Sequence, residues 1–145
     1  MKRLLRFLRL PSDDRKLLAR SGILLWAVRV GLWLLPYEKL RHILLGKPGP
    51  TLTKDADGAS VESIVRSVQL MSRYVPVATC LTKALVTVKL LEEAGQPACL
   101  RIGVARLELG KIEAHAWVES RGKVVIGGTH VDLSRFTVLR AIEGT

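Results

Sequence analysis

Residues 74–104 read YVPVATCLTKALVTVKLLEEAGQPACLRIGV, and this stretch contains the transition that decides the fold. A loop rich in Val, Pro and Thr leads into a helical pattern that runs from about Cys80 to Ala94 and stops at Gly95. From Cys99 the apolar residues recur at every second position, which is the period of a half-buried strand. A helix followed by such strands predicts an α+β fold, with the helix packed on a small antiparallel sheet.

The period of two continues beyond this stretch. Residues 99–109 and 111–119 alternate on either side of a glycine turn, and residues 123–128 follow a second glycine-containing turn. We therefore expect three antiparallel strands joined by tight turns. The tail at 131–142, VDLSRFTVLRAI, is compatible with either a helix or a strand.

Helices are also expected in the first part of the chain. One would run from Ser12, an expected N-cap, to about Leu35, because Pro36 interrupts it. A second would run from Tyr37 to Leu45. Clustered Gly, Pro and Asp predict a linker at 48–58. The chain would thus consist of a helical region at 1–47, this linker, and a core at 59–145 that starts with a further helical pattern.

Residues 1–47 carry most of the positive charge. They hold 11 Lys and Arg against 3 Asp and Glu, a net of +8, whereas residues 48–145 hold 12 against 10, a net of +2. This asymmetry predicts an N-terminal surface for an acidic peptide, a protein, anionic lipid or nucleic acid. The apolar stretch 21–36 is shorter than a membrane span and contains Arg29, which favours a helix packed on the domain or lying at a membrane or partner surface.

The cysteine content indicates a cytoplasmic protein. The chain has two cysteines, Cys80 and Cys99, and no secretory signal-peptide pattern, which favours a reducing compartment. No paired-ligand spacing such as CxxC occurs, and the three histidines are scattered. We therefore expect neither a metal nor another cofactor.

Cys80 is the candidate nucleophile. A thiol at a helix N-terminus meets free amides and the positive end of the helix dipole, which favour the thiolate. The same amides can face the oxyanion that forms during acyl transfer. A free cysteine is also a common core residue, and we interpret Cys99, at the start of an apolar strand, in that way.

His115 is the candidate general base and acid. It alternates with Glu113, Trp117 and Glu119 on the mixed face of its strand, opposite a face of alanine, isoleucine and valine. An imidazole beside the thiol would stabilise the thiolate and later protonate the leaving amine. A helix-start cysteine followed by a strand histidine, with no metal pattern to explain them, favours a catalytic pair over two ordinary core residues.

A third catalytic residue is harder to place. In a hairpin centred near Arg121, the residue opposite His115 is about Gly127, which has no side chain with which to orient the ring. The nearest acid downstream is Asp132. It either orients the imidazole or caps a helix that begins after it.

Three stretches of the sequence are specific in combination: CLTKALVTVKLLEEAGQPACLRIGV at 80–104, AHAWVESRGKVVIGG at 114–128, and the helical region at 9–44. They closely resemble the transglutaminase-like cysteine peptidases of lasso-peptide biosynthesis. The resemblance implies a transglutaminase/papain-like core, with the cysteine at the start of its central helix. It also implies removal of the leader from a ribosomally made precursor peptide.

The family's functional residues map onto this chain only in part. Cys80 matches the nucleophile and His115 the general base and acid. The family's acid falls near Gly127 or Gly128 here, so the match fails at that point. Either Asp132 substitutes, or the pair works as a dyad with a carbonyl group orienting the imidazole.

The resemblance also implies partners. Leader recognition is either fused to the peptidase or left to a separate small protein, and this chain, which starts at the helical region, resembles the split form. Its substrate would be the leader region of the precursor peptide, and residues 1–47 would be a docking surface for the recognition protein or the precursor. An ATP-dependent lasso cyclase would act downstream.

Two other functions are open at this point. The same chemistry with an amine acceptor would make the protein an acyltransferase. A non-enzymatic basic module that binds nucleic acid or a membrane is the other alternative. Nucleic-acid binding is disfavoured, because the chain has no glycine-rich phosphate loop and too few aromatic residues for a base-stacking platform.

Overall fold

The structure, a computed structural model, describes residues 8–45, 60–128 and 131–143. The predicted linker at 48–58 lies outside these ranges, as do the first seven residues.

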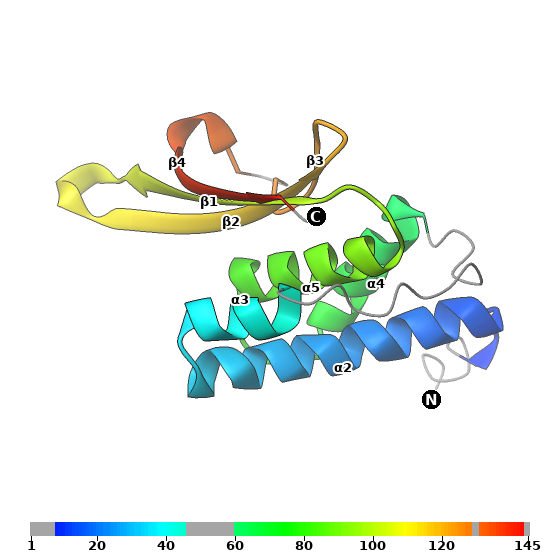
Figure 1. The fold of residues 1–145 in the computed structure, drawn as a ribbon. Helices are drawn as coiled ribbons and strands as arrows, with labels where there is room; N and C mark the ends of the chain where they lie inside the picture. The colour runs from blue at the N-terminus through cyan, green and yellow to red at the C-terminus, as the bar shows by residue number, and fades with distance from the viewer. Residues whose placement is uncertain (1–7, 46–59, 129–130, 144–145) are drawn as a thin grey trace.

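The described chain forms an α+β fold, as predicted, with the helices against one face of an antiparallel sheet and a short 3-10 helix, η2, on the other (Figure 1). The helices are α2 (Ser12–Leu34), α3 (Tyr37–Leu45), α4 (Val61–Ser72) and α5 (Cys80–Glu93). The remaining elements are β1 (Cys99–Arg106), η1 (Glu108–Gly110), β2 (Ile112–Ser120), β3 (Lys123–Ile126), η2 (Leu133–Arg135) and β4 (Thr137–Glu143).

The helix α5 is the centre of the core. Its side chains Leu85, Val86 and Leu91 are fully buried, and they belong to one apolar cluster with residues of α2, α4 and the sheet. Burying one Leu or Val side chain contributes about 1.5–3 kcal/mol, so this cluster holds the helices to the sheet. The buried sheet residues in it are Leu100, Ala116, Val118 and Ile126.

The start of α2 differs from the expectation. Ser12 is the first helical residue rather than the N-cap, and Pro11 occupies the cap position with no side-chain hydrogen bond. The reason is that Pro11 already has an extended backbone (φ −50°, ψ 149°), and its carbonyl accepts a hydrogen bond from the amide of Arg15. Asp13 and Asp14 lie in the first turn, where negative charge is favourable.

The sheet has four described strands in the order β3-β2-β1-β4, all antiparallel, and not the three that were expected. The ambiguous tail forms only the short helix η2 and then becomes β4, which pairs with β1 from Cys99 to Val104. Without β4, the strand β1 would have an unpaired edge. The tail is a strand because it pairs the backbone amide and carbonyl groups of that edge, and because its β-branched residues favour a strand.

The register of the β2–β3 hairpin also differs from the expectation. A turn centred on Arg121 would place Ser120 opposite Gly122, whereas the observed two-residue turn pairs Ser120 with Lys123. Arg121 and Gly122 both have positive φ (51° and 76°), as a twisted two-residue hairpin turn requires. A bulge between Val118 and Glu119 then shifts the pairing by a further residue.

Candidate functional site

Cys80 is the first residue of α5. Thr79 precedes it as N-cap, with its hydroxyl accepting a hydrogen bond from the amide of Thr82 at 3.3 Å and its carbonyl accepting one from the amide of Lys83 at 3.1 Å. Within the described part of the chain, no hydrogen bond engages the amides of Cys80 and Leu81. A half-buried thiol therefore lies beside two available donors at the positive end of a helix, an arrangement suited to holding an oxyanion.

The loop that enters α5 contains a strained residue. Val77 has a φ of 55°, in the left-handed region, and its side chain is exposed. A β-branched residue is rarely found there, and the conformation costs on the order of 1–3 kcal/mol. The neighbouring Val75 is buried in the core, and its carbonyl accepts a hydrogen bond from the amide of Ala78. These contacts hold the strained turn three residues ahead of the thiol.

The imidazole of His115 is fixed by a backbone carbonyl. Nε2 lies 2.5 Å from the carbonyl oxygen of Gly127. Because a carbonyl oxygen only accepts hydrogen bonds, Nε2 must carry the hydrogen, and the lone pair of the neutral ring is then on Nδ1. The ring therefore has one nitrogen used for orientation and the other available as a base.

Gly127 can lie this close to β2 because it has no side chain. Its φ is 87°, and a Cβ there would lie 2.7 Å from the carbonyl oxygen of Ala116 and 2.8 Å from Cβ of Trp117. The strand β2 leaves no room for a larger residue at this position. The carbonyl reaches His115 even though the register differs from the expected one.

The imidazole belongs to a small aromatic cluster. Its centroid is 6.2 Å from that of Trp117 and 5.5 Å from that of Phe136. Trp117 and Phe136 are buried, and with Ala105 they form an apolar cluster separate from the main core. The backbone of Gly103, which pairs with His115, lets both aromatic rings approach the sheet closely.

Charged pairs surround this cluster. Glu119 accepts from the indole Nε1 of Trp117 and forms an ion pair with Arg101 at 2.8 Å. Burial raises the pKa of Glu119, but the hydrogen bonds from Arg101 and Trp117 and the charge of Arg101 outweigh it, so the pKa lies below its usual value. The pair thereby fixes the orientation of the Trp117 ring next to the imidazole.

Cys80 and His115 lie on different sides of the sheet. Ala116 and Val118 face the helices and belong to the main core, against which Cys80 also packs. His115 alternates with them and shares the opposite face with Trp117. Among the described residues, no hydrogen bond or ring contact joins the thiol to the imidazole. The structure therefore places each group in a distinctive environment without bringing the two together, and their pairing stays a prediction.

Asp132 does not contact the imidazole. Its carboxylate accepts hydrogen bonds from the amide and the hydroxyl of Ser134, at 3.1 and 2.5 Å, and so caps η2. These bonds lower the pKa of Asp132, whose side chain is exposed. Of the two roles considered for this residue, the structure shows capping, although of a 3-10 turn rather than of a long helix. The orienting contact that was sought from a carboxylate is made by the carbonyl of Gly127.

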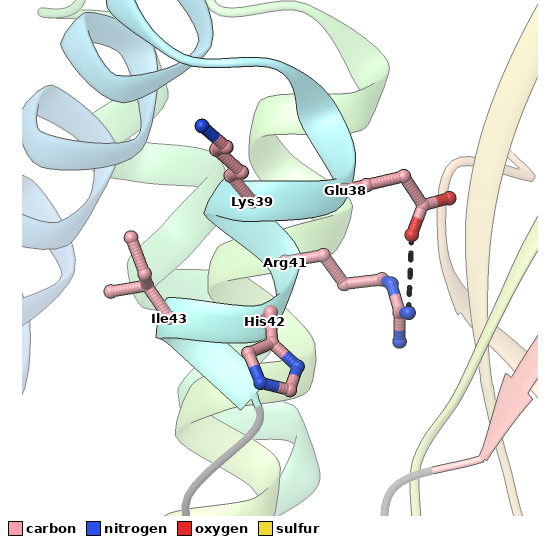
Figure 2. A pocket seen from close by; sticks show the side chains of 5 residues that line it. All are labelled: Glu38, Lys39, Arg41, His42 and Ile43. Atoms are coloured by element: carbon pink, nitrogen blue, oxygen red, sulfur yellow. Dashed lines mark hydrogen bonds and ion pairs between the residues drawn. The ribbon is translucent and has the colours of Figure 1, made fainter.

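Two shallow cavities lie on the helical layer. The larger, of about 380 Å³, is on α3 and is lined by Glu38, Lys39, Arg41, His42 and Ile43 (Figure 2). Glu38 and Arg41 form an ion pair at its side, and no Cys, Ser or Thr is among these five lining residues. The smaller, of about 290 Å³, joins α2 to the loop before Cys80 and is lined by Trp26, Arg29, Val30, Trp33, Pro76 and Val77. Within the described residues, no group of three His, Cys, Asp or Glu side chains is placed to hold a metal ion.

The profile of the transglutaminase-like superfamily matches residues 24–141, which is most of the sequence. The chain belongs to the transglutaminase-like superfamily. The match begins within α2 and ends within β4, so the transglutaminase-like domain includes α5 and nearly all of the sheet. Members of this superfamily are commonly cysteine peptidases and acyltransferases. No curated protein and no solved structure shows significant similarity to the chain.

Two features of this transglutaminase-like site carry little signal in the sequence. The positive φ of Val77 cannot be predicted, because valine ordinarily avoids that region. The Gly127 carbonyl is a backbone group, and only the pair of glycines at 127–128 points to a close approach of the chain. A carbonyl orienting the imidazole was, however, one of the two alternatives that the family resemblance left open.

Proposed function

We propose that this protein is a cytoplasmic cysteine peptidase that removes the leader from a ribosomally synthesised lasso-peptide precursor. The observation that carries the proposal is the position of Cys80. It is the first residue of the central helix of a transglutaminase-like domain, beside two backbone amides with no partner in the described chain. This is the environment that acyl transfer through a thiol requires.

The proposed reaction proceeds through a thioester. The Cys80 thiolate attacks the scissile carbonyl carbon, a C–S bond forms, and the amides of Cys80 and Leu81 bind the resulting oxyanion. The C–N bond then breaks, and the His115 imidazolium gives its proton to the departing amine. Water attacks the thioester, its proton passes to His115, and cleavage of the C–S bond leaves the leader with a free carboxylate.

This chemistry requires His115 to reach the thiol through Nδ1, because Nε2 is occupied by the Gly127 carbonyl. The two groups are on different sides of the sheet in the free protein, so the reaction also requires a change in the backbone of β2 that turns His115 toward α5. Binding of the precursor together with a separate leader-recognition protein would supply the free energy for it. The precursor's leader is then the substrate, and a lasso cyclase that consumes ATP would close the ring afterwards.

The test is cleavage of a precursor peptide, mixed with the protein with and without a candidate recognition protein and followed by mass spectrometry. Cys80→Ala should lower cleavage by at least roughly a thousandfold, because the nucleophile is lost, while leaving binding of the recognition protein intact. Cys99→Ala is the matched control and should retain activity, since Cys99 begins the strand β1.

The products separate the two reaction classes. A free leader acid shows hydrolysis, whereas a new amide on the leader would assign an acyltransferase instead. Full activity of Cys80→Ala would refute the assignment of the nucleophile.

A further inference from the structure

The helix α2 presents an apolar face that the domain does not cover. We define the α2 patch as Ile23, Trp26, Val30, Trp33 and Leu34, all of which are exposed, with Trp33 80% and Trp26 49% accessible. Their spacing of three and four residues places them in one stripe along the helix. At 1.5 Å per residue the stripe is about 16 Å long.

The opposite face of α2 is fully used by the fold. Leu18, Leu25 and Val28 are buried, and the latter two belong to the main core. Ser21 and Gly22 are also buried, and a Cβ on Gly22 would lie 2.7 Å from the end of the Met71 side chain of α4. The helix is therefore anchored along its length and is apolar on two sides. Packing inside the domain explains the apolar residues of the buried side but not those of the exposed side.

The α2 patch continues onto neighbouring segments. Trp26, Val30 and Trp33 line the cavity of about 290 Å³ with the exposed Val77. On α3, Lys39 and Ile43 project to one side of the helix, away from the Glu38–Arg41 ion pair (Figure 2). Ile43 is 67% exposed. The apolar surface is thus broad and shallow rather than one deep pocket.

Basic side chains flank the α2 patch. Arg15 and Lys16 precede it on α2, Arg29 lies beside it, and Lys39 follows it on α3. Within the described residues, no ion pair engages these four side chains. The acids in residues 1–47 are only Asp13, Asp14 and Glu38, against 11 Lys and Arg. The partner of this surface must therefore be apolar and negatively charged at once.

We propose that the α2 patch docks the protein peripherally on an anionic membrane surface. Indole rings and aliphatic side chains on one helix face, with Lys and Arg beside them, match the boundary between headgroups and acyl chains. The helix Ser12–Leu34 is long and apolar enough to cross a membrane by length and composition, but its other face is packed into the main core. A flat surface therefore suits the patch better than a span.

Docking would place the nucleophile's loop at the membrane. Val77 borders the α2 patch and is three residues ahead of Cys80. The thiol would thus be close to the lipid surface, where a precursor with an apolar segment would be concentrated. This surface is independent of the proposed cleavage, because binding to vesicles requires no catalysis.

The experiment is co-sedimentation of the full chain with vesicles of phosphatidylglycerol and phosphatidylcholine in equal parts, compared with vesicles of phosphatidylcholine alone. We expect binding to the anionic vesicles, weaker binding to the neutral ones, loss of binding as salt is raised, and release by an alkaline carbonate wash. Trp33→Glu should weaken binding about tenfold or more, because it places a charge within the inserted face.

Leu109→Glu is the matched control. Leu109 is 97% exposed in the β1–β2 hairpin, far along the chain from the α2 patch, and the substitution adds the same charge. It should bind vesicles as the wild type does, and thermal unfolding should show both variants folded. The proposal is overturned if the wild type does not bind anionic vesicles, or if both variants lose binding equally. Resistance to the carbonate wash, or protection of Trp33 by a recognition protein alone, would also overturn it.

Discussion

At the residue scale, the orientation of the His115 imidazole depends on the backbone carbonyl of Gly127, a residue without a side chain. The Gly127 carbonyl fixes its tautomer, and the absence of a Cβ at Gly127 is what allows β3 to end so close to β2. The sequence points to Cys80 and His115 as candidates, because a thiol at a helix start and a histidine in a strand have recognisable contexts. It does not identify the carbonyl, because every residue has one and only the register decides which is used.

Gly127→Ala tests this arrangement. The new Cβ would collide with the Ala116 carbonyl oxygen, and the φ of 87° would be strained, so we expect a loss of about 1–3 kcal/mol in the free energy of unfolding. The measurement is denaturant unfolding, with NMR of the imidazole nitrogens to follow the tautomer. Gly122→Ala is the control, because Gly122 has a similar φ of 76° but no atom within 4 Å of its Cβ position. Equal losses in the two variants would contradict the close approach of Gly127 to β2.

At the element scale, α3 and α5 were predicted to within a residue, whereas β4 and the hairpin register were not. Pro36 and Gly95 are local signals, and they fix helix ends without reference to the rest of the chain. The pairing of β4 with β1 joins segments more than thirty residues apart. A bulge such as that at Val118–Glu119 depends on sheet twist. Neither leaves a local pattern.

The cap of α5 gives a prediction at this scale. Thr79→Ala removes the acceptor of the Thr82 amide and should cost about 1 kcal/mol of the free energy of unfolding. Thr79→Ser should restore most of it, since the hydroxyl is retained. Ser60→Ala is the comparison on α4, where Ser60 caps the amide of Ser63 in the same way. If Thr79→Ala leaves unfolding by denaturant unchanged, the helix does not depend on this cap.

At the scale of the whole molecule, the sheet separates the two candidate catalytic groups. The thiol packs against the main core, and the imidazole belongs to the aromatic cluster on the other face. The α+β class could be predicted, because the change from a helical period to a period of two lies in one stretch. The catalytic roles of Cys80 and His115 stay predictions. The spatial relation of the two residues could not be predicted, because it depends on which face of β2 the helices cover.

This separation makes a kinetic prediction for the free protein. With Cys99→Ala as background, so that one thiol remains, iodoacetamide should alkylate Cys80 at nearly the same rate with His115 and with His115→Ala. The reason is that no contact joins the two groups. Adding the precursor and the recognition protein should make the two rates differ. If His115→Ala slows alkylation in the free protein, the thiol and the imidazole already interact without partners.

The presence of two clusters with no shared side chain has a consequence for how this domain can change. A substitution in the main core and one in the aromatic cluster should change the free energy of unfolding nearly additively, since the strands lie between the two clusters. The surroundings of Cys80 and those of His115 are therefore free to diverge along separate mutational paths. A lineage could alter what one half recognises without having to rebuild the other.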